Sequence, residues 1–187
     1  METRLADPDR SSVPGAVYWI TGLAGVGKST LARAIAARLA AQARPAIRIE
    51  GDRLWPILGA RYGPGLADRH AMALTYARLC QEFSHQGTDV ICASICLDDE
   101  ARRWARARIV DYREIYLRAS PDLLAARLPK GMIAAGQAGR LRNVPGVDLP
   151  IEAPEAPEVL VNDDGSRSAE EIAAVVFEAL WPRRPGQ

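Results

Sequence analysis

Short apolar runs alternate with stretches of helical periodicity along most of the chain. Five runs rich in β-branched and aromatic residues predict strands, at residues 16–21, 46–52, 88–96, 114–119 and 157–161. Apolar residues that recur every three or four positions predict amphipathic helices at residues 31–41, from 68 to about 83, at 98–110, from 120 onward and from 168 to 180. Strands that alternate with helices predict an α/β fold, a three-layer sandwich around a mostly parallel five-stranded sheet.

Local signals place some of the helix starts. Asp68 is expected to cap its helix, Ser120 and Pro121 form a strong start, and Ser168 with Glu171 forms a capping box. Residues 55–65 contain glycines and prolines and predict an irregular loop.

The periodicity breaks down between residues 128 and 157, where lysine, arginine, glycine and proline cluster. A long irregular segment in a compact domain is usually functional, so we predict a lid here. We expect residues 1–14 to form a flexible N-terminus, residues 15–182 to form a single domain, and residues 183–187 to be a tail.

Composition narrows the class of protein. The chain has 187 residues and a net charge of +1, and neither its charge nor any apolar run favours a nucleic acid or a membrane as partner. Its start has acids and a proline where a signal peptide needs an apolar stretch. The three cysteines are odd in number and not at ligand spacing, so we expect reduced thiols in a cytoplasmic protein.

The first strand leads into a glycine-rich loop, residues 22–29, that reads G-x-x-x-x-G-K-S. Strand, loop and helix together give the context in which this pattern indicates a phosphate-binding P-loop, whereas a plain turn between core elements would not need the Lys-Ser pair. The spacing does not fit the dinucleotide pattern G-x-G-x-x-G. We therefore predict a site for ATP and Mg²⁺, in which Lys28 reaches the phosphates and Ser29 ligates the metal. The nucleotide-binding set is Gly22, Leu23, Ala24, Gly25, Val26, Gly27, Lys28, Ser29 and Thr30.

Two acids, Glu50 and Asp52, end the second predicted strand. Two residues apart in a strand, they would point to the same face. A carboxylate there could accept a proton from an acceptor hydroxyl or hold a Mg²⁺-bound water, and solvated acids at a strand end are the alternative.

Several segments resemble the adenylylsulfate (APS) kinases, which phosphorylate the ribose 3′-hydroxyl of adenylylsulfate. Residues 19–30 resemble the opening of that family, 49–52 its Leu-Asp-Gly-Asp, and 68–69 its Asp-Arg pair beside the substrate. Residues 127–131 are similar to its Arg-Asp-Pro-Lys-Gly, and 146–158 to its lid and the run into its last strand. The resemblance implies Mg²⁺-ATP, Arg127 near the ATP base, Asp52 beside the acceptor hydroxyl and metal, a mobile lid, and a possible homodimer.

This sequence differs from the family at positions where the family's members bind adenylylsulfate. Trp55 replaces an arginine, Gly63-Pro64-Gly65 replaces Gly-Phe-Ser, and residues 144–148 lack the lid's aromatic residue. Residues 73–75 lack an arginine-rich turn, and residues 95–99 lack a serine and an arginine. Base stacking contributes on the order of 1–3 kcal/mol per base, so these losses predict weakened adenylylsulfate binding. The tentative substrate set is Glu50, Asp52, Trp55, Arg69, Cys96, Lys130 and Arg142, with Tyr62 and Arg140 also available.

Cys96 is expected to face the cleft after the third strand, either as a reactive thiol or as a small apolar filler. The predicted function is that of an ATP-dependent kinase acting on a hydroxyl of a small metabolite or nucleotide-like acceptor, with Lys28 and Asp52 as catalytic residues. A true adenylylsulfate kinase and a catalytically silent nucleotide-binding regulator are the alternatives. A GTPase switch is disfavoured because the sequence has no Asp-x-x-Gly after the P-loop and no Asn/Thr-Lys-x-Asp.

Overall fold

The structure is a computed structural model that describes residues 13–58, 62–97, 99–128 and 132–181. Most of the predicted N-terminus, the tail after residue 181 and Lys130 therefore lie outside the described residues. The elements in chain order are β1 (Val17–Thr21), α1 (Lys28–Ala41), β2 (Ala46–Glu50), α2 (Gly51–Leu58), α3 (Leu66–His85), β3 (Asp89–Ala93), α4 (Glu100–Arg108), β4 (Tyr112–Ala119), α5 (Pro121–Arg127), α6 (Met132–Gln137), β5 (Val159–Asp163) and α7 (Ala169–Leu180).

The five strands form one parallel sheet in the order β2-β3-β1-β4-β5. In its centre, Ile20 of β1 is in register with Ala93 of β3 and Ile115 of β4. Because all strands run in the same direction, their carboxyl ends meet at one edge. The P-loop, the start of α2 and the residues after β3 lie together there, where open α/β sheets bind ligands.

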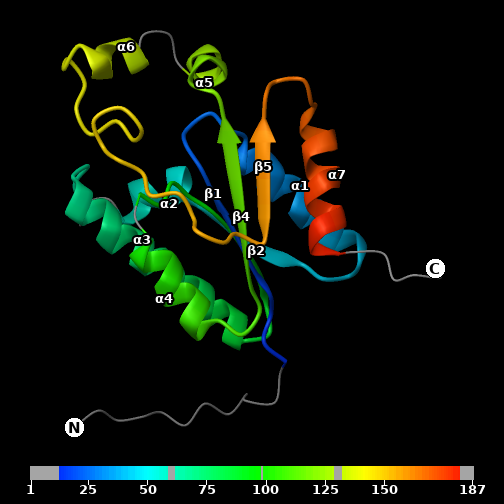
Figure 1. Ribbon diagram of the computed structural model, residues 1–187. Helices are drawn as coiled ribbons and strands as arrows, with labels where there is room; N and C mark the ends of the chain where they lie inside the picture. Colours follow the sequence, from blue (N-terminus) through cyan, green and yellow to red (C-terminus); the bar gives the residue numbers. More distant parts are fainter. Residues whose placement is uncertain (1–12, 59–61, 98, 129–131, 182–187) are drawn as a thin grey trace, which may run out of the picture.

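Helices cover both faces of the sheet, which confirms the predicted three-layer α/β fold (Figure 1). Alternate residues of β1 point to opposite layers, as the pleat requires. Tyr18 and Ile20 pack in the core cluster beneath α1 and α7, whereas Val17 and Trp19 pack in the cluster beneath α3 and α4. The capping box at the start of α7 is also confirmed.

Two local predictions are wrong. Residues 51–58 form the helix α2, where a strand end and a loop were expected. The helix is favoured because it packs Leu54, Trp55 and Leu58 against the core cluster beneath α3 and α4. Gly65, not Asp68, is the N-cap of α3, and Asp68 lies in the first turn of the helix. An acid in that turn is favoured by the helix dipole, so its sequence signal resembles that of a cap.

The lid segment, residues 128–157, contains the short helix α6 and is otherwise irregular. Its C-terminal part is fixed to the loop before α4: Glu152 N donates to Leu97 O (2.7 Å), and the Glu152 carboxylate accepts from Asp99 N (2.9 Å). Buried Arg102 donates to Glu152 O (3.0 Å). The end of the lid segment is thus coupled to the residues that follow β3.

Among the residues that the structure describes, no helix is long and apolar enough to cross a membrane.

Candidate functional site

The P-loop curls between β1 and α1 because three of its residues, Gly22, Gly25 and Gly27, have φ values of 141°, 80° and 102°. Side chains disfavour this region, so glycine is required. At Gly22 a β-carbon would also lie 2.3 Å from Leu117 O of β4. Val26 is buried in the core and anchors the loop. A curled glycine backbone of this kind is what a phosphate cradle of successive N–H groups requires.

Lys28 begins α1 and bends back over the loop. Its Nζ donates to Gly22 O (2.9 Å) and Leu23 O (2.8 Å). Burial lowers the pKa of Lys28 to about 8, although the nearby Asp52 carboxylate acts in the opposite direction. The ammonium group is therefore held ready at the loop by carbonyl oxygens, which phosphate oxygens can replace.

A cavity of about 390 Å³, the phosphate cavity, opens in front of the P-loop. Asp52 and Ser29 both line this space and come from two different elements, α2 and α1. Its lining residues are Ala24, Gly25, Gly27, Lys28, Ser29, Thr30, Gly51, Asp52, Ala93, Ser94, Ile95 and Leu128. The cavity thus combines a cation, P-loop amides and a carboxylate, the groups that phosphoryl transfer needs.

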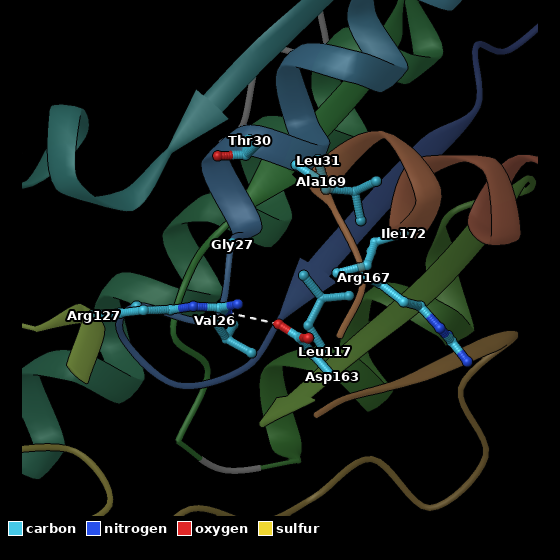
Figure 2. Close-up of a pocket in the computed structure, with 11 residues that line it drawn as sticks. Val26, Gly27, Thr30, Leu31, Leu117, Arg127, Asp163, Arg167, Ala169 and Ile172 are labelled. Atoms are coloured by element: carbon cyan, nitrogen blue, oxygen red, sulfur yellow. Dashed lines mark hydrogen bonds and ion pairs between the residues drawn. The ribbon is translucent and has the colours of Figure 1, made fainter. Parts of the chain in front are cut away.

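A second cavity of about 230 Å³, the nucleoside cavity, lies between the P-loop, β5 and α7 (Figure 2). It shares Gly25, Gly27 and Thr30 with the phosphate cavity. Arg127 at the end of α5 reaches its edge and forms an ion pair with Asp163, 2.6 Å between Nη1 and Oδ2. Arg127 therefore lies beside the P-loop, and its expected place near the ATP base stays a prediction. Asp163 and Arg167 also line the cavity and were missed, although their place just after the last strand was an available signal.

A third cavity of about 260 Å³, the acceptor cavity, lies between α2, α3 and the end of β3. Gly51, Asp52, Ser94 and Ile95 line both this cavity and the phosphate cavity. The remaining lining residues are Trp55, Arg69, Met72, Ala73 and Tyr76. The two cavities are therefore joined at Asp52, the arrangement that a donor site and an acceptor site need.

Arg69 links three parts of the acceptor side. Its guanidinium lies 5.4 Å from the centre of the Trp55 ring, within range of a cation–π contact. Its Nε donates to Pro64 O (2.9 Å), and its Nη2 donates to Asn143 O in the lid segment (3.3 Å). Burial lowers the pKa of Arg69, and the Asp148 carboxylate opposes this shift. Arg69 thus joins α2, the loop before α3 and the lid segment.

Other predicted site residues lie elsewhere. Glu50 and Asp52 do not share the face of a strand, because Asp52 belongs to α2, and the Glu50 carboxylate pairs with Arg48 at 3.5 Å. Cys96 does not face the cleft: it is 1% exposed in the core beneath α3 and α4, as the apolar-filler alternative requires. Arg142 is exposed in the lid segment and lines none of these three cavities.

The chain offers few protein ligands for a metal. Within the described residues there is no group of three or more His, Cys, Asp or Glu side chains that could hold an ion. The Ser29 hydroxyl and the Asp52 carboxylate are nevertheless oxygen donors that line one cavity beside the P-loop. This donor set fits Mg²⁺, which binds through one or two protein oxygens together with phosphate oxygens and water.

Comparison with known proteins agrees with this geometry. The sequence model of the family described as adenylylsulphate kinase matches residues 14–162. An adenylyl-sulfate kinase of Myxococcus xanthus is 36% identical over 154 residues, which cover 80% of this chain and 83% of that protein. A cytidine diphosphoramidate kinase of Campylobacter jejuni is 31% identical over 164 residues, which cover 88% of this chain and 95% of that protein.

Among solved structures, an APS kinase of Mycobacterium tuberculosis in complex with AMPPNP and APS superimposes with a TM-score of 0.80. It is 28% identical, and the match covers 89% of this chain and 98% of that one. The matched family region contains all the residues that line the phosphate and acceptor cavities, and the P-loop and Arg127 part of the nucleoside cavity. The chain therefore belongs to the adenylylsulphate kinase family of ATP-dependent kinases.

Proposed function

We propose that this ATP-dependent kinase transfers the γ-phosphoryl group of Mg²⁺-ATP to a hydroxyl of a small nucleotide-like acceptor bound between α2 and α3. One observation carries the proposal: Asp52 lines both the phosphate cavity and the acceptor cavity. A group at that junction can contact the acceptor hydroxyl while the γ-phosphate lies against the P-loop. Such proximity accounts for much of the rate that enzymes gain in two-substrate reactions.

The proposed chemistry uses few groups. The acceptor oxygen forms a bond to the γ-phosphorus as the bond from that phosphorus to the β,γ-bridging oxygen breaks, and ADP leaves. The Asp52 carboxylate accepts the proton of the acceptor hydroxyl. The Lys28 ammonium and the P-loop amides stabilise the negative charge on the phosphoryl oxygens.

Ser29 and Asp52 would hold Mg²⁺, Ser29 directly and Asp52 through water. The metal, when bound, neutralises charge on the β- and γ-phosphate oxygens. Arg127 and the walls of the nucleoside cavity would hold the base and sugar of ATP, because that cavity continues directly from the P-loop.

The acceptor cavity favours a compact acceptor with an anionic or aromatic part. Arg69 supplies one cation and Trp55 one aromatic surface, and Met72 and Ala73 supply apolar surface. Val144 occupies the lid position at which the adenylylsulfate kinases are expected to have an aromatic residue. Its side chain is buried against Gly136 and lines an apolar cavity on the P-loop side, away from the acceptor cavity. We therefore propose an acceptor that binds without aromatic residues on both sides of its base. Adenylylsulfate is the alternative acceptor.

The test is release of ADP from Mg²⁺-ATP by the wild-type chain, with no acceptor, with adenylylsulfate and with cytidine diphosphoramidate. The Lys28→Ala variant serves as the blank. Stimulation by either compound supports phosphoryl transfer to a nucleotide-like acceptor. Stimulation by cytidine diphosphoramidate supports the proposed acceptor, whereas stimulation by adenylylsulfate supports the alternative, a true adenylylsulfate kinase. ATP binding with no stimulation by these compounds or by a panel of hydroxylated nucleotides would contradict it and favour a silent nucleotide-binding regulator.

A further inference from the structure

Ser94 is a buried serine at the junction of the phosphate and acceptor cavities, directly after β3. The residue is 3% exposed, and its Oγ has no hydrogen-bond partner among the residues that the structure describes. Its backbone is fixed, because Ser94 N donates to Ile20 O (3.1 Å). A β-carbon placed on Gly51 would lie 3.5 Å from Ser94 Cβ, so Ser94 packs beside the residue that precedes Asp52. The backbone and Cβ of Ser94 are therefore held at this junction.

A second buried serine shows the usual arrangement. Ser84 in α3 is 0% exposed, and its Oγ donates to Gly15 O at 2.6 Å. Buried hydroxyl groups are normally paired in this way because an unpaired one loses its hydrogen bonds to water without replacement. The hydroxyl groups of Tyr18 and Tyr112 are also buried without a hydrogen-bond partner among the described residues, but neither tyrosine lines any of the three cavities. Ser94 lines two of them, so a bound ligand can supply the partner that its hydroxyl lacks.

The acceptor is a better partner for Ser94 than the phosphates are. Lys28 and the P-loop already provide donors on the phosphate side. In the acceptor cavity, by contrast, Arg69 donates to Pro64 O and Asn143 O, and the Tyr76 hydroxyl donates to Gly51 O (3.4 Å). Trp55, Met72, Ala73 and Ile95 supply apolar surface in that cavity.

We propose that Ser94 is a specificity-determining residue whose hydroxyl hydrogen-bonds an oxygen of the acceptor next to the hydroxyl that is phosphorylated. The inference rests on the proposed function and deepens it, because it describes the acceptor as a compound with two neighbouring oxygens, such as a vicinal diol. Asp52 binds one of these oxygens and Ser94 the other. A site with a buried polar group strongly disfavours analogues that leave the group unpaired.

The test compares Ser94→Ala with the matched variant Ser84→Ala, using steady-state kinetics and thermal unfolding. Adenylylsulfate and cytidine diphosphoramidate are the acceptors. In Ser94→Ala, kcat/KM for the accepted compound should fall about tenfold, the loss of one neutral hydrogen bond, while KM for ATP stays unchanged. Its unfolding midpoint should not fall, because the hydroxyl has no partner in the free chain. Ser84→Ala should lose about 2–4 °C and keep its acceptor kinetics.

Two results would overturn the proposal. One is a midpoint in Ser94→Ala that falls as far as that of Ser84→Ala, which would show a structural hydroxyl. The other is a KM for ATP that rises as much as the KM for the acceptor, which would place the hydroxyl on the phosphate side. If the wild-type chain used neither these acceptors nor any compound of the panel of hydroxylated nucleotides, the proposed function would fail, and the unfolding midpoints would still decide whether the hydroxyl is idle in the free chain.

Discussion

Arg127 and Asp163 form an ion pair, 2.6 Å between Nη1 and Oδ2, that joins the end of α5 to the end of β5 beside the P-loop (Figure 2). The Asp163 side chain is 2% exposed and also accepts from Gly165 N (2.9 Å), whereas the Arg127 side chain is 35% exposed. The buried acid therefore fixes an arginine whose other groups remain accessible to a ligand in the nucleoside cavity.

Replacing Arg127 with alanine should weaken both the fold and ATP binding. The variant leaves a buried carboxylate without its cation, which should cost about 1–3 kcal/mol of unfolding free energy. KM for ATP should rise about tenfold with little change in kcat, because Arg127 lines the nucleoside cavity and not the acceptor cavity. The double variant Arg127→Ala/Asp163→Asn should regain stability without regaining affinity. An unchanged KM for ATP would remove Arg127 from the nucleotide site.

Asp52→Asn should abolish phosphoryl transfer while ATP still binds, because an amide cannot accept the acceptor's proton. We expect a fall in kcat of about 10²–10⁴-fold, the usual contribution of general base catalysis. Glu50→Gln is the matched control: it neutralises an acid two residues away that pairs with Arg48 and lines neither cavity. Turnover is measured as ADP release and ATP affinity by calorimetry. Full activity in Asp52→Asn, or equal losses in both variants, would contradict the assignment.

The sequence predicted the layers and the P-loop because those features depend on local patterns. Apolar runs and glycine spacing determine β1, the loop and α1 through backbone geometry alone. The acceptor side was harder to predict. Whether Trp55 lies in a loop or in a helix depends on packing against a core formed by α3 and α4, which are distant in sequence. The same holds for Cys96, whose burial follows from the turn of the chain after β3.

Ser94 gave no sequence signal at all, because a serine after a buried strand is common. Its missing hydrogen-bond partner and its place in the lining of two cavities distinguish it from Ser84, and both follow only from the folded chain. Asp163 and Arg167 could have been found, since the carboxyl end of every parallel strand is a candidate ligand edge.

The lowered pKa of Lys28 predicts a specific pH dependence of stability. The pKa is about 8 in the folded chain and has an ordinary value of 10.5 in an unfolded one. Below pH 8 both states hold the proton, and the buried ammonium lowers stability by its full amount. As the pH rises from 8 to 10.5 the folded state releases its proton first, so this cost disappears.

The unfolding free energy of the wild type should therefore rise relative to that of Lys28→Met by about 1–3 kcal/mol between pH 7 and pH 10.5. Urea denaturation at both pH values measures the difference, and all other titrating groups cancel between the two chains. A difference that stays constant, or that moves in the opposite direction, would contradict the lowered pKa.

Substitutions at two glycines of the lid segment can distinguish the effect of backbone strain from the effect of contact with the P-loop. Gly139 and Gly146 both have positive φ, 70° and 81°. A β-carbon at Gly139 would meet nothing within 4 Å, whereas one at Gly146 would lie 2.6 Å from Leu23 Cδ2. Leu23 belongs to the P-loop and lines an apolar cavity together with Val144 and Val147 of the lid segment. Gly146 is thus the position where the lid segment approaches the nucleotide loop most tightly among the described glycines.

Alanine at either position should cost about 1 kcal/mol or more through strain at positive φ. Only Gly146→Ala should also disturb the contact with the P-loop, because the added methyl group forces the Leu23 side chain or the lid segment to shift. We expect a several-fold rise in KM for ATP and faster proteolytic cleavage within residues 128–157 for Gly146→Ala, and neither change for Gly139→Ala. Identical kinetics and cleavage rates in the two variants would show that this contact does not hold the lid segment over the P-loop.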